Sequence, residues 1–164
     1  MDRVTLKNKS KKNRDQDVVR PGQGTDEIYL GQRETEVREI LGKPDHTIRR
    51  FRDSYFYIYK RKGMDLDFGK KSGKLKVIFF YREGCEGHGA AKVITDKGVR
   101  PGDTRAKVVR TYGSPDDQHT ASVFRDGFYL REWFFYRIGI QFQFGPDRRV
   151  DIISISRKKK KKSS

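Results

Sequence analysis

Residues 30–45 read LGQRETEVREILGKPD, and this stretch decides the fold because a related stretch follows later in the chain. Val37, Ile40 and Leu41 have the spacing of one helix face, which predicts a two-turn amphipathic helix. Gly42 then supplies the left-handed conformation that ends many helices, and the proline two residues later cannot continue the helix. The stretch therefore predicts a short helix closed by a glycine–proline turn.

The related stretch lies 71 positions further along, where residues 101–116 read PGDTRAKVVRTYGSPD. The shift aligns the glycine, proline and aspartate that end the two stretches. A later pair of segments also matches, GMDLDF at residues 63–68 and GIQFQF at residues 139–144, now 76 positions apart. Self-similarity at a nearly fixed spacing predicts two copies of one structural unit.

Each helix precedes segments in which apolar and polar residues alternate, as they do in half-buried strands. The predicted strands lie at 47–52, 55–59, 64–68 and 75–81 in the first half, and at 121–125, 128–137, 140–144 and 150–155 in the second. Short connections between them favour antiparallel pairing. In the second helix, Asp103 or Thr104 is the predicted cap, while Val108 and Tyr112 face the core.

The predicted fold class is therefore α+β, with two tandem repeats, each a short helical segment followed by a three- to four-stranded antiparallel sheet. One face of each sheet packs on the helices and the other is left open to solvent or a partner. The predicted parts are a basic flexible arm at 1–20, a first α+β repeat at 21–81, a Gly-rich connection at 82–97, a second α+β repeat at 98–156 and a polybasic tail at 157–164.

The 164-residue chain carries a formal net charge of +16, unevenly distributed. The arm holds +4 and the tail +6, which leaves +6 on the remainder. Cys85 is the one cysteine, so an internal disulfide is excluded. No apolar run at the start predicts a secretory or lipoprotein signal, and no segment has a membrane-spanning length. We therefore expect a soluble, cytoplasmic protein.

The endings LGKPD at 41–45 and GSPD at 113–116, each followed by an antiparallel meander, carry a resemblance to a known family. The pattern resembles the SmpA/OmlA-like domain of small bacterial envelope-assembly lipoproteins. In tandem it resembles the beta-lactamase inhibitory protein, and the resemblance spans residues 24–156. It implies a binding module that presents a sheet face or cleft to another protein. The chain lacks the lipoprotein signal of the first relative and the disulfide cysteines of the second.

Two stretches interleave aromatic residues with Arg and Lys, at residues 48–62 and 124–137. Such strands suit a protein interface, where Tyr, Trp and Arg dominate the binding energy. They also suit base stacking with arginines on phosphates. Alternatively, Phe56, Ile58, one ring series and Trp133 form the core. The predicted partner-binding residues are Arg49, Arg52, Tyr55, Tyr57, Tyr59, Arg131, Tyr136, Gln141 and Gln143.

Two groups of residues carry side chains that can bind metals or act in catalysis. Cys85 and His88 form a CxxH pair, too few ligands for a structural zinc site and an improbable spacing for a nucleophile–base pair. Asp65 and Asp67 share a strand face, as paired catalytic carboxylates would. A polar, exposed sheet face explains them as well, because the matching positions in the second half are glutamines. We predict no catalytic residue, no metal and no cofactor.

The sequence thus predicts a non-enzymatic protein-binding or assembly module that uses the solvent-facing sheet surface, with basic tails adding electrostatic attraction. The alternative is a nucleic-acid-binding protein that uses aromatic and basic sheet faces, with an affinity that falls steeply with salt. An aromatic surface of mixed charge would favour the first function, and a continuous basic groove would favour the second.

Overall fold

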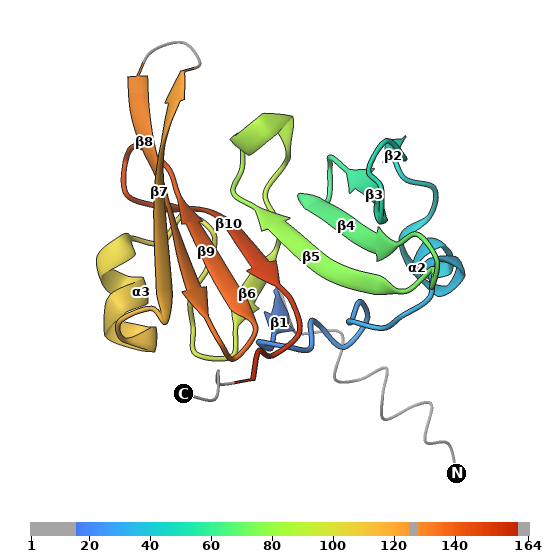
Figure 1. Cartoon of the computed structure of the whole chain (residues 1–164), viewed down its shortest axis with the longest axis horizontal. Coiled ribbons are helices and arrows are strands. Elements are labelled where there is room, and N and C mark those ends of the chain that lie inside the picture. The colour runs from blue at the N-terminus through green and yellow to red at the C-terminus, as the bar shows by residue number, and fades with distance from the viewer. Residues whose placement is uncertain (1–15, 125–127, 161–164) are drawn as a thin grey trace.

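The computed structural model describes residues 16–124 and 128–160 (Figure 1). Its helices are α2 (Glu34–Leu41), α3 (Arg105–Tyr112) and the short 3-10 turn η1 (Cys85–Gly87). Its strands are β1 (Asp17–Val19), β2 (His46–Ile48), β3 (Ser54–Tyr59), β4 (Met64–Gly69), β5 (Leu75–Tyr81), β6 (Val93–Thr95), β7 (Asp117–Phe124), β8 (Phe128–Tyr136), β9 (Ile140–Phe144) and β10 (Val150–Ile155). The α+β class is therefore confirmed.

Eight of these strands form a single antiparallel sheet in the order β2-β3-β4-β5-β10-β9-β8-β7. A separate sheet of three or four strands was expected in each half. Instead, β5 pairs with β10, from Tyr81 opposite Ile152 to Ile78 opposite Ile155, and joins the two groups of four strands into one sheet. Both central strands are rich in β-branched and aromatic residues, which favour such pairing.

The strands β1 and β6 form a small parallel pair of their own, in a part of the chain where no strand was predicted. Asp17–Val19 falls within the predicted flexible arm, and Val93–Thr95 within the predicted connection. The pairing is stabilised by burial, because Val19 is fully buried and Val93 is 4% exposed. Residues 1–15 of the arm and 161–164 of the tail lie outside the described residues.

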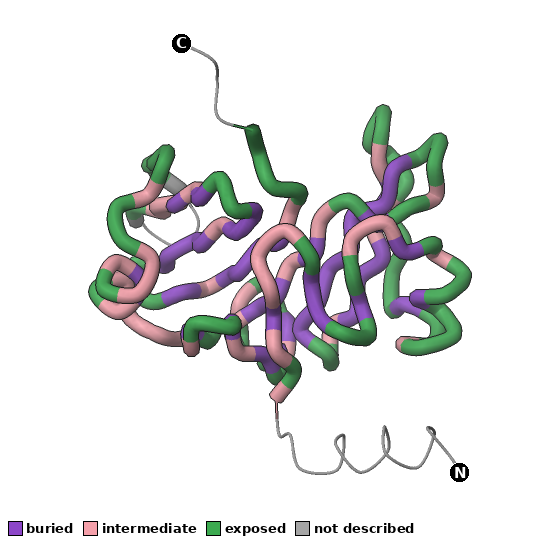
Figure 2. The backbone as a smooth tube through the Cα atoms, turned by 90° about the horizontal axis from the view of Figure 1, so that it is seen from below, coloured by how far each residue is buried: buried purple, intermediate pink, exposed green. Residues whose placement is uncertain are grey.

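One face of the large sheet carries the core. Its apolar side chains pack with those of α2, α3 and the β1–β6 pair in a single cluster, which includes Val37 and Val108 from the helices and Val19 from β1. Figure 2 shows the buried segments running through the middle of the molecule, with exposed segments in the turns around it. The helix faces were predicted correctly except for Ile40, which is 44% exposed because α2 is only eight residues long and buries a narrow stripe.

The two helices end in the same way. Gly42 follows α2 with φ of 81°, and Gly113 follows α3 with φ of 79°. A tyrosine at the end of a strand donates a hydrogen bond to each of these glycine carbonyls, Tyr59 to Gly42 at 2.9 Å and Tyr136 to Gly113 at 2.8 Å. Carbonyls at a helix C-terminus lack a partner within the helix, so each tyrosine satisfies one of them and fastens the helix to the sheet.

The aspartates of the two turns also play matching parts. The carboxylate of Asp45 accepts a hydrogen bond from the backbone N–H of Lys60 at 2.7 Å, and Asp116 accepts one from Arg137 at 2.7 Å. In both halves the bond ties the turn after the helix to the start of a hairpin turn, the one that follows the second strand after that helix. The aspartates are therefore structural. Thr104 caps α3 as predicted, by accepting from the N–H of Lys107.

We predict that Tyr59→Phe and Tyr136→Phe each lower the free energy of unfolding by about 1 kcal/mol, because each leaves a helix-end carbonyl without its donor. Urea denaturation followed by circular dichroism measures the change. Tyr29→Phe is the control, since Tyr29 is 43% exposed. Equal stability of all three variants would show that the tyrosine hydroxyls do not fasten the helices.

Candidate functional site: the open face of the sheet

The face of the large sheet that points away from the helices is called the open face below. Its residues follow from the strand register. One row crosses all eight strands and consists of His46, Ile58, Asp65, Phe79, Ser154, Gln141, Phe135 and Asp117. The neighbouring row contains Tyr81, Ile152, Gln143, Trp133 and His119. The open face therefore mixes rings, carboxylates and amides.

Aromatic side chains on this face remain half-buried. On the β3–β5 side, the ring of Phe56 packs edge-on against Phe51 with centroids 5.0 Å apart, and it lies 6.2 Å from Phe79. Phe51, in the turn after β2, is 46% exposed. On the β8 side, Trp133 lies 5.4 Å from the ring of His119. The exposed part of such a ring can still be covered by a partner, and removing this apolar surface from water is favourable.

Three of the predicted partner-binding tyrosines are not on this face, and their prediction as solvent-facing residues is wrong. Tyr55, Tyr57 and Tyr59 are 5%, 1% and 3% exposed, on the face that packs against α2. The hydroxyls of Tyr55 and Tyr57 both donate to the same oxygen of Glu34, at 2.8 and 2.6 Å. The bond from Tyr57 is the largest of the effects that lower the pKa of Glu34. A partner for the hydroxyls within the helix is what allows these rings to enter the core.

Tyr136 is buried for the same reason, because its hydroxyl reaches Gly113. Of the expected core residues, Ile58 is buried at 7% exposure although it lies on the open face, while Phe56 and Trp133 are half-buried on that face. The alternation of the strand was predicted correctly, but the sequence carries apolar residues on both faces of β3. The available clue was Glu34, an acid in the first turn of the helix that the tyrosines of β3 could reach.

The remaining predicted residues fall into two separate places. Arg131, Gln141 and Gln143 lie on the open face, in β8 and β9, where Gln143 accepts a hydrogen bond from the indole of Trp133 at 2.9 Å. Arg49 and Arg52 are exposed in the connection between β2 and β3, at the far edge of the sheet. The guanidinium of Arg49 lies over the ring of Tyr55 at 5.1 Å.

A buried polar cluster holds the loop around η1 onto the open face. Asp65 accepts a hydrogen bond from the hydroxyl of Tyr81 at 2.6 Å, and its other oxygen lies 2.7 Å from Nε2 of His88. The rings of His88 and Tyr81 stack with centroids 3.7 Å apart. Burial, followed by the bond to Asp65, raises the pKa of Tyr81 far above its usual value. His88 thus pairs with a strand carboxylate through Nε2, while its Nδ1 lies 3.2 Å from the backbone carbonyl of Cys85.

Cys85 itself is poorly suited to nucleophilic or metal chemistry. Burial is the main cause that raises the pKa of its thiol to about 11, so the thiolate is scarce at neutral pH. Within residues 16–124 and 128–160, three or more His, Cys, Asp or Glu side chains nowhere lie close enough together to hold a metal ion. The geometry of the loop is explained by its attachment to Asp65.

Charges of both signs are distributed over the open face. Asp67 is 9% exposed, and burial raises the pKa of its carboxyl, an effect that Lys76 and Ser54 partly offset. Arg131 lies 3.8 Å from the carboxylate of Glu86 in the η1 loop. At the end of β5, the guanidinium of Arg82 lies 2.7 Å from Asp147. The middle of the face is therefore mixed in charge and forms no continuous basic groove.

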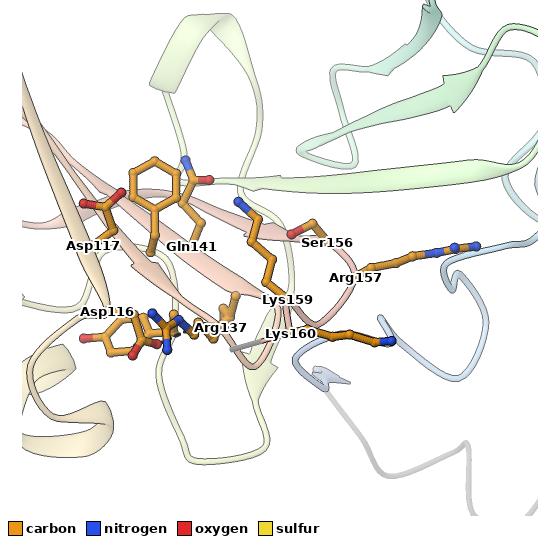
Figure 3. Close-up of a pocket in the computed structure, with 11 residues that line it drawn as sticks. Asp116, Asp117, Arg137, Gln141, Ser156, Arg157, Lys159 and Lys160 are labelled. Carbon is orange, nitrogen blue, oxygen red and sulfur yellow. Dashed lines mark hydrogen bonds between the residues drawn. The ribbon is translucent and has the colours of Figure 1, made fainter. Parts of the chain in front are cut away.

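A cavity of about 400 Å³, called the tail pocket below, lies where the β8–β9 hairpin meets the start of the C-terminal tail (Figure 3). Its sheet side includes Phe135 and Gln141 of the open face, together with Tyr136. Its outer side is formed by Ser156, Arg157 and the lysines that follow. Two of the predicted site residues, Tyr136 and Gln141, thus meet there. The basic tail was predicted to attract partners, but its place beside the sheet was not predicted.

We predict that Asp65→Ala loosens the η1 loop and lowers the free energy of unfolding by about 1–3 kcal/mol, because Tyr81 and His88 both lose a buried partner. The rate at which Cys85 reacts with a thiol reagent should rise in the native protein. Asp67→Ala is the matched control, since Asp67 lies on the same strand and face without contacting the loop. Equal labelling rates in the two variants would contradict the attachment of the η1 loop through Asp65.

Comparison with known proteins identifies the fold only. No protein-family model matches the sequence, and no curated protein matches it either. Among solved structures, the chain is similar to a DUF4309 family protein, YjgB, from Bacillus subtilis. The two share 16% sequence identity at a TM-score of 0.55, over 84% of this chain and 88% of the other. The fold is thus one that a bacterial DUF4309 protein also adopts.

Two longer bacterial proteins match the chain over part of their length. One is a cysteine-rich secretory protein from Staphylococcus aureus, at 11% identity and a TM-score of 0.50. The match covers 85% of this chain and 50% of the other. The other is an extracellular protein containing a SCP domain from Bacillus anthracis, at 12% identity and a TM-score of 0.48, with 78% of this chain and 44% of the other covered. The helices among the described residues are too short or too polar to cross a membrane.

Proposed function

We propose that this chain is a non-enzymatic protein-binding module and that the open face is its binding surface. The observation that carries the proposal is the set of half-buried rings on that face, formed by Phe56, Phe79, Trp133 and Phe135. The helices and the β1–β6 pair lie on the opposite face, where they bury the tyrosines. A sheet that is apolar on both faces but packed on one gains free energy when a partner covers the other.

The mixed charge of the open face supports a protein partner over a nucleic acid. The polar groups that stay partly exposed on this face include the amide of Gln141 and the Arg131–Glu86 pair, since Asp65, Asp67 and Gln143 are buried. Neutral groups and opposite charges of this kind suit a protein better than a uniformly negative phosphate chain. The proposed surface therefore has an aromatic centre with polar neighbours, as protein interfaces commonly have.

The proposal includes two copies of one unit in the chain. The hydrogen bonds that Tyr59 and Tyr136 donate to the helix-ending glycines support it, as do the backbone N–H bonds that Asp45 and Asp116 accept. Each unit would correspond to a helix and four strands, related to the other about the β5–β10 pair. The resemblance to SmpA/OmlA-like domains rests on the same turns and remains part of the proposal.

A location outside the cytoplasm is also proposed. The Staphylococcus aureus neighbour is described as secretory, which speaks against the cytoplasmic location expected from the sequence. Fractionation of the source cells followed by immunoblotting checks this point. Recovery of the chain in the cytosolic fraction would contradict this part of the proposal and leave the binding surface untouched.

We predict that Phe51→Ser weakens partner capture by about five- to twentyfold, since an exposed ring at a binding surface contributes roughly 1–2 kcal/mol. The wild-type chain is immobilised, incubated with an extract of the source cells and washed, and the bound proteins are quantified. Leu130→Ser is the matched control, because Leu130 is 54% exposed but lies on the helix side of the sheet.

Equal capture by the two variants would contradict the assignment of the open face. Capture of nucleic acid alone, abolished by nuclease and insensitive to Phe51→Ser, would contradict the function itself. Circular dichroism and the urea midpoint of each variant confirm that the comparison is made between folded proteins.

A further inference from the structure

The tail pocket has a wall whose backbone is fixed. The N–H of Lys159 donates to the carbonyl of Arg137 at 2.9 Å, and the N–H of Ser156 donates to the carbonyl of Gly139 at 3.2 Å. That same carbonyl accepts a second bond, from the N–H of Gly22 at 3.0 Å. The polar tail therefore runs along the β8–β9 hairpin as an ordered segment up to residue 160, and its cations stand at defined positions.

Four cations line this pocket, Arg137, Arg157, Lys159 and Lys160. In the part of the chain that the structure describes, none of the ion pairs includes any of the four. Figure 3 shows Lys159 pointing toward Gln141, while Arg157 and Lys160 extend away from the aspartates on the other side. The pocket thus holds cations that make no ion pair within the described residues, although two aspartates share the pocket with them.

The two acids of the pocket are already engaged with backbone. Asp116 accepts from the N–H of Arg137, and Asp117 accepts from the N–H of Gln118 at 2.9 Å. Their presence still opposes a uniformly charged phosphate chain that passes through the pocket. A peptide avoids that conflict, because it can place carboxylates near the cations and neutral groups near the aspartates.

The pocket also has an apolar side, where the ring of Phe135 is half-buried while Tyr136 and Ile140 behind it are only 8% and 2% exposed. Its volume of about 400 Å³ lies within the range of sites that hold small ligands, roughly 300–1,000 Å³, and accommodates a few side chains at most. A suitable occupant therefore combines negative charge with at least one apolar side chain, over a short length of chain.

We propose that the tail pocket binds an acidic segment of the partner protein, with carboxylates paired to Arg137 and Lys159 and an apolar side chain against the half-buried ring of Phe135. The proposal rests on the proposed function, because Phe135 and Gln141 belong both to the open face and to the pocket. It adds the chemistry of the partner at one end of the surface, and it gives the basic tail a specific role.

The test uses the full chain and a fluorescent hexapeptide of alternating Glu and Phe, capped at both ends, with binding followed by anisotropy. Replacing the three glutamates by glutamine should weaken binding at least about tenfold at low salt, because the charge-assisted contacts are lost. The Arg137→Ala, Lys159→Ala double variant should weaken binding of the glutamate peptide by about five- to tenfold, as expected for two partly exposed charge contacts.

The charge-matched control is the Lys70→Ala, Lys71→Ala double variant, which removes two exposed cations from the β4–β5 turn, outside the pocket. Its affinity for the peptide should change less than about twofold, since distant charges are screened by salt. Equal losses in the two double variants would overturn the proposal in favour of general attraction to a basic protein. So would equal binding of the glutamate and glutamine peptides.

A second variant tests the wall without changing any charge. A Cβ at Gly139 would clash with the carbonyl oxygen of Ser156 and with the backbone of Gly22, so Gly139→Ala should displace the tail and weaken binding of the glutamate peptide by at least about fivefold. Gly98→Ala is the matched control, because Gly98 has a similar φ of +91° against +96° and no atom within 4 Å of the added Cβ. Retained peptide affinity in folded Gly139→Ala would overturn the role of the wall.

The outcomes separate this proposal from the proposed function. If Phe51→Ser weakens partner capture as predicted while the Arg137, Lys159 variant binds both partner and peptide normally, the pocket proposal alone is wrong. If the peptide binds at the pocket but Phe51→Ser leaves partner capture unchanged, the assignment of the open face is wrong and the proposal for the pocket is retained. Tighter binding of a six-nucleotide oligouridylate than of the peptide, lost in the Arg137, Lys159 variant, would assign the pocket to nucleic acid and overturn the proposal.

Discussion

The pairing of β5 with β10 is the interaction on which the rest of the structure depends. Ile78, Phe80, Ile153 and Ile155 are fully buried on its core face, and the chain between these strands forms one complete half of the sheet. Without this ladder, each group of four strands would expose an apolar edge strand, which is a site of aggregation. With it, strands of both halves contribute to one open face, on which the η1 loop is held by Asp65 and Tyr81.

The turns and most strands were predictable because their determinants are local. Gly42 and Gly113 end helices through backbone conformations that glycine adopts readily, and strand alternation in β4 and β9 is visible in the printed sequence. The joining of the sheets was not predictable in this way, because it depends on contacts between strands about seventy residues apart. The β1–β6 pair was missed for the same reason, since three-residue strands carry too short a pattern.

The choice of buried face depended on single polar contacts. The three tyrosines of β3 look amphipathic in sequence and suit an interface, yet Glu34 and Gly42 supply acceptors for their hydroxyls and so permit burial. The less polar Phe56 is left on the open face. Hydrophobicity alone would bury Phe56 before the tyrosines. The prediction from rings and arginines therefore placed four tyrosines on the wrong face, whereas Arg131 and the two glutamines do lie on the open face.

The carbonyl of Gly139 has a consequence for the order of folding. It accepts hydrogen bonds from Gly22, near the start of the described chain, and from Ser156, near its end. The bond from Gly22 joins segments that are distant in sequence, and the bond from Ser156 waits for the last strand to pair with β9. Contacts of this kind form late and slowly, because the chain loses the entropy of loop closure before the contacts contribute any stabilisation. The pocket wall should therefore be among the last parts to mature, and a nascent chain would acquire its acidic-segment site only after the sheet is complete.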